Sequence, residues 1–187
     1  MNRIELLNFI PKNGIVVEMG VCAGEFSKEI LIRTSPSKLF LVDIWGHISL
    51  NYNDDNMVSN PKHEERYRYV FKNFKDDNRV KLIRSLTDSL LELFPENYFD
   101  WSYVDADHSY EGCLKDLNIS KKIVKENGYI LGHDYMYKFP GVIQAVDQFV
   151  KENNYYLTYL TDKEKNPSYL ISKNVNSHTV MKNILQI

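Results

Sequence analysis

The stretch Tyr98-Phe-Asp-Trp-Ser-Tyr-Val-Asp-Ala-Asp-His-Ser-Tyr-Glu-Gly112 decides the fold that we predict for this chain. Its first half, residues 99–104, is aromatic and β-branched and predicts a buried strand. Directly after this strand, Asp105, Asp107 and His108 place two carboxylates and an imidazole close together. Burying several ionisable groups is costly unless they pair, bind a metal or take part in chemistry. The stretch therefore predicts a functional site at a strand end, with a polar turn that caps a helix starting near Glu111 as the alternative.

Strand and helix patterns alternate on both sides of this stretch. We expect the other strands at residues 14–19, 38–44, 80–84, 129–131, 155–159 and 168–172. We expect helices at residues 3–10, 25–33, 63–74, 89–94, 111–126 and 141–151, with Ser85–Asp88 capping the fourth and Gly128 ending the fifth. The alternation predicts a Rossmann-like α/β fold, with a seven-stranded, mostly parallel sheet, helices on both faces and a C-terminal antiparallel hairpin.

Length and composition indicate one ordinary soluble domain. The 187 residues include 43% hydrophobic and 26% charged residues, enough for a single core, which we place at residues 14–173. Residues 46–61 are rich in Asn and Asp without a period and predict a loop that closes over a ligand, while residues 174–187 predict a polar linker with a short tail helix. The net charge of −2, without a basic tract, argues against a nucleic-acid partner.

Cysteine usage and the N-terminal residues predict a cytoplasmic protein. Cys22 and Cys113 lack the spacing of metal ligands, which indicates reduced thiols. The first residues lack the basic start and apolar run of a secretory signal, and the sequence has no apolar run long enough to cross a bilayer. We therefore expect no membrane partner.

A glycine turn with flanking acids indicates a ligand site after the first two strands. In Glu18-x-Gly20-x-x-x-Gly24 the glycines let a ligand approach the backbone and the N-terminus of the next helix. The spacing differs from the dinucleotide and phosphate motifs, which argues against NAD and ATP. Asp43 ends the second strand about 20 residues after the first glycine, where related sheets bind a ribose diol. The alternatives are a turn without a ligand and a solvated acid.

Two further carboxylates predict a cation site. Asp105 and Asp134 end neighbouring strands, and two such groups can share a divalent ion through their oxygens. His108 lies three residues after Asp105 and is our candidate for the general base that takes a proton from a hydroxyl. The alternative for His108 is a structural imidazole that caps a helix or makes a hydrogen bond.

Together these motifs resemble class I S-adenosylmethionine-dependent methyltransferases, most closely the branch that includes macrocin O-methyltransferase. The resemblance covers residues 14–173 and depends on five motifs in order. They are Val16-Val-Glu-Met-Gly-Val-Cys-Ala-Gly24, Leu41-Val-Asp-Ile-Trp45, Phe99–Gly112, Gly128-Tyr-Ile-Leu-Gly-His-Asp-Tyr135 and Gly141-Val-Ile-Gln-Ala-Val-Asp-Gln-Phe149. The first motif alone is unspecific, whereas the ordered set is strong.

The resemblance implies a role for each candidate residue in binding S-adenosylmethionine. Glu18, Gly20, Val21 and Gly24 would line its methionine part, while Asp105 also lies in the cofactor site. Asp43 would hold the ribose, residues around Arg84 to Thr87, including Ser85 and Leu86, would lie near the adenine end, and Ile44 would also bind the cofactor. Asp105 and His108 would be catalytic, and Asp105, His133 and Asp134 would bind Mg²⁺ or another divalent cation. The acceptor would be a small polar molecule such as a sugar, and family members commonly form homo-oligomers.

The sequence departs from the family at three positions. Cys22 replaces the middle glycine of the commonest cofactor motif, and Tyr135 replaces an Asn of the catechol-type enzymes. His133 stands where the metal sites often carry Glu, which removes a hard oxygen ligand and favours a softer ion.

Two other functions remain open from the sequence. Asp105-Ala-Asp107 matches the Asp-x-Asp metal motif of nucleotide-sugar glycosyltransferases. His133 and Tyr135 also allow a catalytically inactive module that only binds the cofactor.

Overall fold

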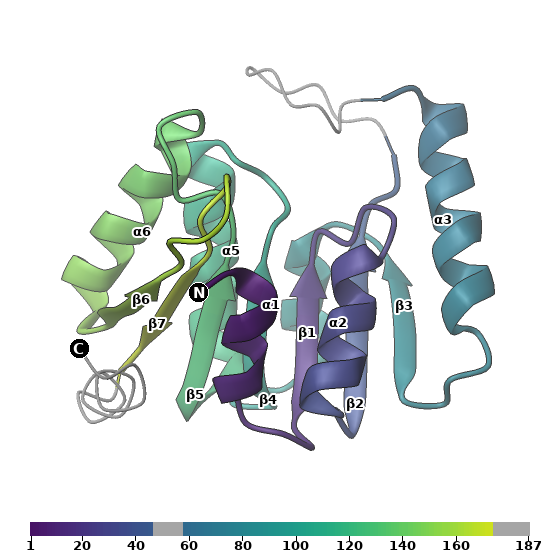
Figure 1. Cartoon of the computed structure of the whole chain (residues 1–187), viewed down its shortest axis with the longest axis horizontal. Coiled ribbons are helices and arrows are strands. Elements are labelled where there is room, and N and C mark those ends of the chain that lie inside the picture. Colours follow the sequence, from purple (N-terminus) through teal and green to yellow (C-terminus); the bar gives the residue numbers. More distant parts are fainter. Residues whose placement is uncertain (47–57, 174–187) are drawn as a thin grey trace.

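The computed structural model describes residues 1–46 and 58–173, which build one seven-stranded sheet in the order β3-β2-β1-β4-β5-β7-β6 (Figure 1). The strands are β1 Ile15–Met19, β2 Lys38–Asp43, β3 Val80–Arg84, β4 Phe99–Val104, β5 Val124–Gly132, β6 Tyr156–Leu160 and β7 Tyr169–Ser172. Strands β1 to β5 pair in parallel, whereas β7 is antiparallel to both β5 and β6. The predicted fold class is confirmed, including the C-terminal hairpin.

Helices cover both faces of this sheet. They are α1 Arg3–Leu6, α2 Glu25–Thr34, α3 Asn60–Phe74, α4 Leu90–Leu93, α5 Tyr110–Ile123 and α6 Pro140–Asn153, with short 3₁₀ turns η1 Leu7–Phe9 and η2 Thr87–Ser89. In Figure 1, α1 and α2 lie in front of the sheet and α5 lies behind it. Val16 joins the hydrophobic cluster on the α1–α2 face, while its neighbour Val17 joins the cluster on the α5–α6 face. Both side chains are buried because successive residues of a strand point to opposite faces.

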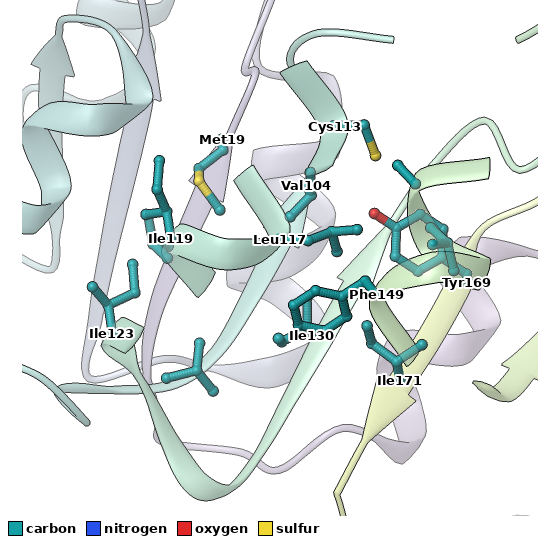
Figure 2. Close-up of a cluster of buried hydrophobic side chains, with 14 of the residues drawn as sticks. Met19, Val104, Cys113, Leu117, Ile119, Ile123, Ile130, Phe149, Tyr169 and Ile171 are labelled. Atoms are coloured by element: carbon teal, nitrogen blue, oxygen red, sulfur yellow. The ribbon is translucent and has the colours of Figure 1, made fainter. Parts of the chain in front are cut away.

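The larger core lies between the sheet and helices α5 and α6. Figure 2 shows Leu117 of α5 and Phe149 of α6 among side chains of strands β4, β5 and β7. Both residues are fully buried. The buried side chains of these two helices therefore hold the C-terminal half of the sheet in place.

Two predicted boundaries around α5 and β5 were wrong. The helix ends at Ile123 rather than Glu126, and Gly128 lies inside strand β5 instead of ending the helix. A Cβ atom on Gly128 would lie 2.5 Å from the carbonyl oxygen of Asp100. This glycine therefore permits close packing of β5 against β4. In the sequence, such a glycine cannot be told apart from one that ends a helix.

Two helix starts were also wrong. Helix α3 begins at Asn60 with Pro61 in its first turn, where the missing N–H of proline costs nothing, so the predicted loop 46–61 was too long. Helix α4 begins without a side-chain cap, and Thr87 of the predicted capping segment donates a hydrogen bond to Asp116 of α5.

Two predicted segments fall partly or wholly outside the described residues: most of the loop at 46–61, and the tail at 174–187. Within residues 1–46 and 58–173, none of the helices has the length and apolar character needed to span a membrane.

Candidate active site

The carboxyl ends of five strands are joined side by side, and this edge brings the predicted site residues together. The residue after each strand donates a backbone hydrogen bond to the neighbouring strand's end. These bonds run from Ser85 to Asp43, from Gly20 to Val42, from Asp105 to Met19 and from His133 to Val104, with N–O distances of 2.8–3.1 Å. Candidates on β1, β2, β4 and β5 therefore lie along one edge of the sheet, as predicted from parallel topology.

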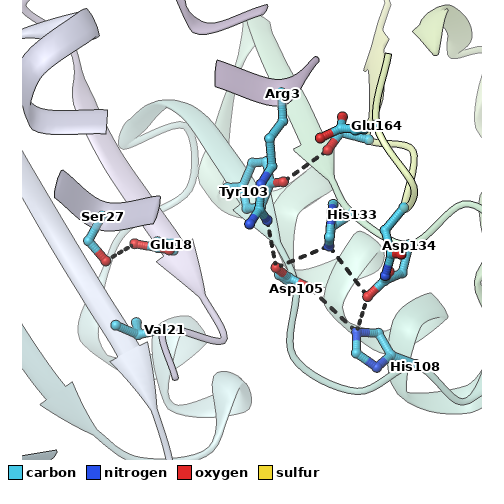
Figure 3. A network of polar contacts seen from close by, with 12 residues as sticks. Arg3, Glu18, Val21, Ser27, Tyr103, Asp105, His108, His133, Asp134 and Glu164 are labelled. Carbon is cyan, nitrogen blue, oxygen red and sulfur yellow. Dashed lines mark hydrogen bonds and ion pairs between the residues drawn. The ribbon is translucent and has the colours of Figure 1, made fainter. Parts of the chain in front are cut away.

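Two carboxylates and two imidazoles form the centre of this edge (Figure 3). Nε2 of His108 lies 3.4 Å from Oδ1 of Asp105 and 3.1 Å from Oδ2 of Asp134. Nδ1 of His133 lies 3.6 Å from Oδ2 of Asp105 and 3.4 Å from Oδ2 of Asp134. Each ring nitrogen thus bridges the same two acids, and we call Asp105, His108, His133 and Asp134 the acid–imidazole cluster.

Protonation within the acid–imidazole cluster favours charged acids. Burial opposes ionisation of Asp105 and Asp134, but hydrogen bonds to the two histidines lower the pKa of both carboxyls, well below the usual range for Asp134. Burial likewise disfavours a charged His133, yet its hydrogen bonds to Asp105 and Asp134 raise its pKa to about 9. At neutral pH the cluster therefore holds two carboxylates and a cationic His133.

His108 is held in place by the segments around it. Its ring centroid lies 4.5 Å from that of Phe139, and the side chain is 7% exposed. Ser109 accepts a hydrogen bond from the backbone N–H of Gly112 and so caps α5. The polar turn of the alternative interpretation is therefore present, with Ser109 as the cap, while His108 faces the carboxylates; that this place is a functional site stays a prediction.

Asp107 lies outside the acid–imidazole cluster. Its Oδ1 accepts a hydrogen bond from the backbone N–H of Ser109 at 2.8 Å, and its side chain packs where a Cβ atom on Gly112 would lie. Of the two acids in the Asp-x-Asp pattern, Asp105 thus belongs to the acid–imidazole cluster, whereas Asp107 accepts a hydrogen bond in the turn before α5. This separation argues against the shared metal site of the glycosyltransferase alternative.

The glycine turn has the conformation that its glycines allow. Gly20 and Gly24 have φ values of 87° and 79°, in the left-handed region that other residues rarely adopt. Gly24 is the N-cap residue of α2, and Val21 between the glycines is buried.

Asp43 braces this turn. Its Oδ2 accepts hydrogen bonds from the backbone N–H groups of Val21 and Cys22, both at 2.9 Å, and its Oδ1 accepts one from Trp45 at 2.7 Å. A carboxylate has about four acceptor positions, so one remains for a ligand hydroxyl. The sequence did not indicate the bracing role, and the ribose role stays a prediction.

Glu18 is fully buried beneath the turn. Its Oε2 accepts a hydrogen bond from the hydroxyl of Ser27 at 2.5 Å. Burial raises the pKa of Glu18 to about 8, against the effect of this bond. A protonated Glu18 supports the turn from below, and a direct contact with a ligand ammonium group stays a prediction.

Strand ends β2 and β3 supply an apolar surface beside Asp43. Ile44 is half-buried, and Leu86 is 47% exposed. Ser85 lies between Leu86 and the strand and is fixed by its backbone bond to Asp43. Ile44 and Ser85 follow paired strand ends on the side of the turn away from the acid–imidazole cluster, and their part in cofactor binding stays a prediction.

Sequence reasoning missed two residues that touch the acid–imidazole cluster. Nη1 of Arg3, from helix α1, lies 3.6 Å from Oδ2 of Asp105, and its guanidinium lies 4.7 Å from the ring centroid of Phe26. Nδ2 of Asn166, between β6 and β7, donates to Oδ1 of Asp134 at 2.5 Å. Both come from segments at the ends of the described chain, and no spacing pattern pointed to them.

The predicted divalent cation can be compared with these contacts. Asp105, His108 and Asp134 could each turn one ligand atom toward a shared ion. However, side-chain nitrogens already lie against both carboxylates, and two of them belong to the cations Arg3 and His133. Mg²⁺ prefers six oxygen ligands and would be repelled by these charges. The cluster therefore does not fit Mg²⁺, and we derive no step through a metal.

Comparison with known proteins identifies the domain type. A family model described as a methyltransferase domain matches residues 17–135. An uncharacterized protein of Acanthamoeba polyphaga mimivirus is 31% identical over 96 residues, which cover 50% of this chain and 37% of that protein. The chain thus spans little more than a third of that relative's length.

Solved structures share the fold at low sequence identity. A precorrin-6y C5,15-methyltransferase from Geobacter metallireducens is 13% identical with a TM-score of 0.62, covering 90% of this chain and 83% of that one. A ribosomal protein L11 methylase from Lactobacillus delbrueckii is 16% identical with a TM-score of 0.58, covering 90% of this chain and 76% of that one. Spermidine synthase from Thermotoga maritima is 18% identical with a TM-score of 0.59, covering 94% of this chain and 59% of that one.

Proposed function

The chain belongs to the methyltransferase domain family, and from that premise we propose that it methylates a hydroxyl group of a small polar acceptor such as a sugar, with His108 as the general base. One observation carries this proposal: Nε2 of His108 is held between the carboxylates of Asp105 and Asp134 at the strand edge that also bears the glycine turn. Macrocin O-methyltransferase-like specificity is part of the same proposal.

The residues along this edge fit S-adenosylmethionine. Leu86 and Ile44 offer apolar surface for a flat adenine, and Asp43 has one acceptor position left for a ribose hydroxyl. The N-terminus of α2, directly after the glycine turn, offers backbone N–H groups to a carboxylate. When bound, this cofactor supplies a methyl group on a positively charged sulfur, which leaves as a neutral thioether.

The acid–imidazole cluster fits proton removal from a hydroxyl. A neutral His108 whose Nε2–H faces the two carboxylates accepts the acceptor's proton at its other ring nitrogen, Nδ1, as the acceptor oxygen forms its bond to the methyl carbon and the bond from that carbon to sulfur breaks. The imidazolium that results lies 3.4 Å and 3.1 Å from the carboxylates of Asp105 and Asp134, which stabilise its charge. Phe139 holds the ring in position throughout. The chain's own residues thus contribute positioning and a proton acceptor.

Calorimetric titration of the purified chain with S-adenosylhomocysteine tests the cofactor assignment. We expect micromolar binding, with a uridine diphosphate sugar showing none. The reverse preference would favour the glycosyltransferase alternative. Methyl transfer is then tested by release of S-adenosylhomocysteine with a panel of sugars and other small alcohols, and tight cofactor binding without release would favour the inactive module.

A further inference from the structure

Every carboxylate oxygen of Asp105 and Asp134 already has a side-chain nitrogen beside it. Oδ1 of Asp105 lies against His108, and its Oδ2 lies against Arg3 and His133. Oδ1 of Asp134 accepts from Asn166, and its Oδ2 lies against both imidazoles. These nitrogens occupy the directions from which a metal ion would approach.

The guanidinium among these partners is positioned by the fold. Helix α1 begins with a capping box, in which Asn2 accepts from the N–H of Glu5 and Glu5 accepts from the N–H of Asn2. Leu6 and Leu7 are buried in the core below, so the helix is anchored at both ends. Because the position of helix α1 is fixed, the side chain of Arg3 extends across the ring of Phe26 to Asp105. It is 29% exposed.

His133 is fixed just as firmly. Its backbone N–H bonds to the carbonyl oxygen of Val104, which sets the residue at the end of β5 directly beside β4. Its Nδ1 consequently lies near both acids. Figure 3 shows Arg3 and His133 approaching Asp105 from different elements.

We propose that Arg3 and His133 together take the place of a divalent metal ion in this site, so that the site works without a metal. The nitrogens of these two side chains lie against carboxylate oxygens of Asp105 and Asp134 that a metal ion would need as ligands, and Nε2 of His108 lies between the same two acids. This inference rests on the proposed function for the reaction involved, whereas the metal-free character is a property of the cluster itself.

The test uses Mn²⁺, whose binding is read directly by electron paramagnetic resonance of the full chain. The wild type should show no bound Mn²⁺ at submillimolar concentration. The variant Arg3→Gln/His133→Glu removes the guanidinium and the imidazole from the two acids and adds a carboxylate, and it should bind one Mn²⁺ at least tenfold more tightly than the wild type. Arg33→Gln, which removes an arginine paired with Glu29 on α2, is the matched control and should behave as the wild type.

Three further readouts keep the outcomes separate. Binding of S-adenosylhomocysteine reports that each variant is folded, and Arg3→Gln alone serves if the double variant is not. Mn²⁺ binding by the wild type that is lost in Asp134→Asn would overturn the proposal. Absence of Mn²⁺ binding in every variant would also overturn it, because Arg3 and His133 would not be what excludes the metal. Failure of the wild type to bind S-adenosylhomocysteine would overturn the proposed function and leave the metal result standing.

Discussion

A Cβ atom on Gly20 would overlap the backbone carbonyl oxygen of Asp105. The turn after β1 therefore packs directly on the chain that follows β4, with no room for a side chain between them. Since φ of Gly20 is also in the left-handed region, any other residue there meets both a steric and a conformational cost. The same glycine that leaves the turn open to a ligand also positions Asp105.

We predict that Gly20→Ala lowers the free energy of unfolding by about 2–4 kcal/mol. Gly46→Ala is the matched control, because the nearest atoms to its Cβ are at 3.6 Å and φ is unstrained. That control should change stability by less than about 0.5 kcal/mol. Urea unfolding followed by circular dichroism measures both, and equal stability of the two variants would contradict the packing role.

The mostly parallel sheet and the strand ends that carry Asp105 and Asp134 could be predicted from sequence because they depend on local patterns. Apolar runs give strands, and a polar residue directly after such a run must lie at the sheet's carboxyl edge. Asp105 is placed by this rule directly, and Asp134 follows two residues after the end of its strand. Gly128 shows the limit of local patterns. A glycine that permits contact between strands cannot be distinguished in sequence from a glycine that ends a helix.

Arg3 and Asn166 mark the other limit. Each reaches the acid–imidazole cluster through tertiary packing of an element far away in sequence, the first through helix α1 and the second through the β6–β7 hairpin. Thr87 is similar, since a residue suited to capping α4 bonds instead to an acid on α5. Partners chosen by the three-dimensional arrangement leave no spacing pattern to detect.

Asp116 should make stability pH-dependent. Burial raises its pKa to about 7, so the folded state retains a proton that the unfolded chain loses near its ordinary value of 3.8. The free energy of unfolding that Asp116 contributes therefore falls as pH rises from about 4 to about 7. Asp116→Asn should remove this part of the slope and gain stability relative to wild type at pH 8.

Urea unfolding at pH 5, 6, 7 and 8 measures the difference between the two proteins. Asp88→Asn, whose side chain is 55% exposed, is the control and should keep the wild-type slope. Because burial also raises the pKa of Glu18, Glu18 likewise makes the free energy of unfolding fall as pH rises to about 8. Asp116→Asn should retain this contribution from Glu18. A constant difference between Asp116→Asn and wild type at every pH would contradict the assignment.

The bond from Thr87 to Asp116 links η2 to α5, with an Oγ1–Oδ1 distance of 2.6 Å. Thr87→Val keeps the shape of the side chain but leaves the buried carboxyl without this donor. We expect a loss of about 1–3 kcal/mol at neutral pH. In Asp116→Asn the same Thr87→Val change should cost less, and a double-mutant cycle measures the coupling. A coupling of zero would show that the bond contributes nothing.

Asp43 should discriminate between ribose and 2′-deoxyribose in the cofactor. If its remaining acceptor position binds a ribose hydroxyl, the wild type should bind S-adenosylhomocysteine about tenfold more tightly than the 2′-deoxy analogue. Asp43→Asn keeps an acceptor for the backbone of the turn, and we expect this preference to shrink to within about twofold. Calorimetry measures both ligands on both proteins, with Asp76→Asn at an exposed site as the control. An undiminished preference in Asp43→Asn would leave Asp43 as a brace only.

His108→Gln should separate catalysis from cofactor binding. Glutamine retains a polar side chain between Asp105 and Asp134 but has no group that takes up a proton near neutral pH, so kcat should fall by about 10²–10⁴-fold. The affinity for S-adenosylhomocysteine should change by less than about twofold, because the glycine turn and Asp43 are untouched. Phe139→Leu, which removes the ring 4.5 Å from the imidazole, should lower kcat less than this. The rate of S-adenosylhomocysteine release with a hydroxyl acceptor measures all three proteins, with His63→Gln on α3 as the control. Wild-type turnover in His108→Gln would remove the base assignment, and a fall confined to cofactor affinity would place His108 in cofactor binding instead.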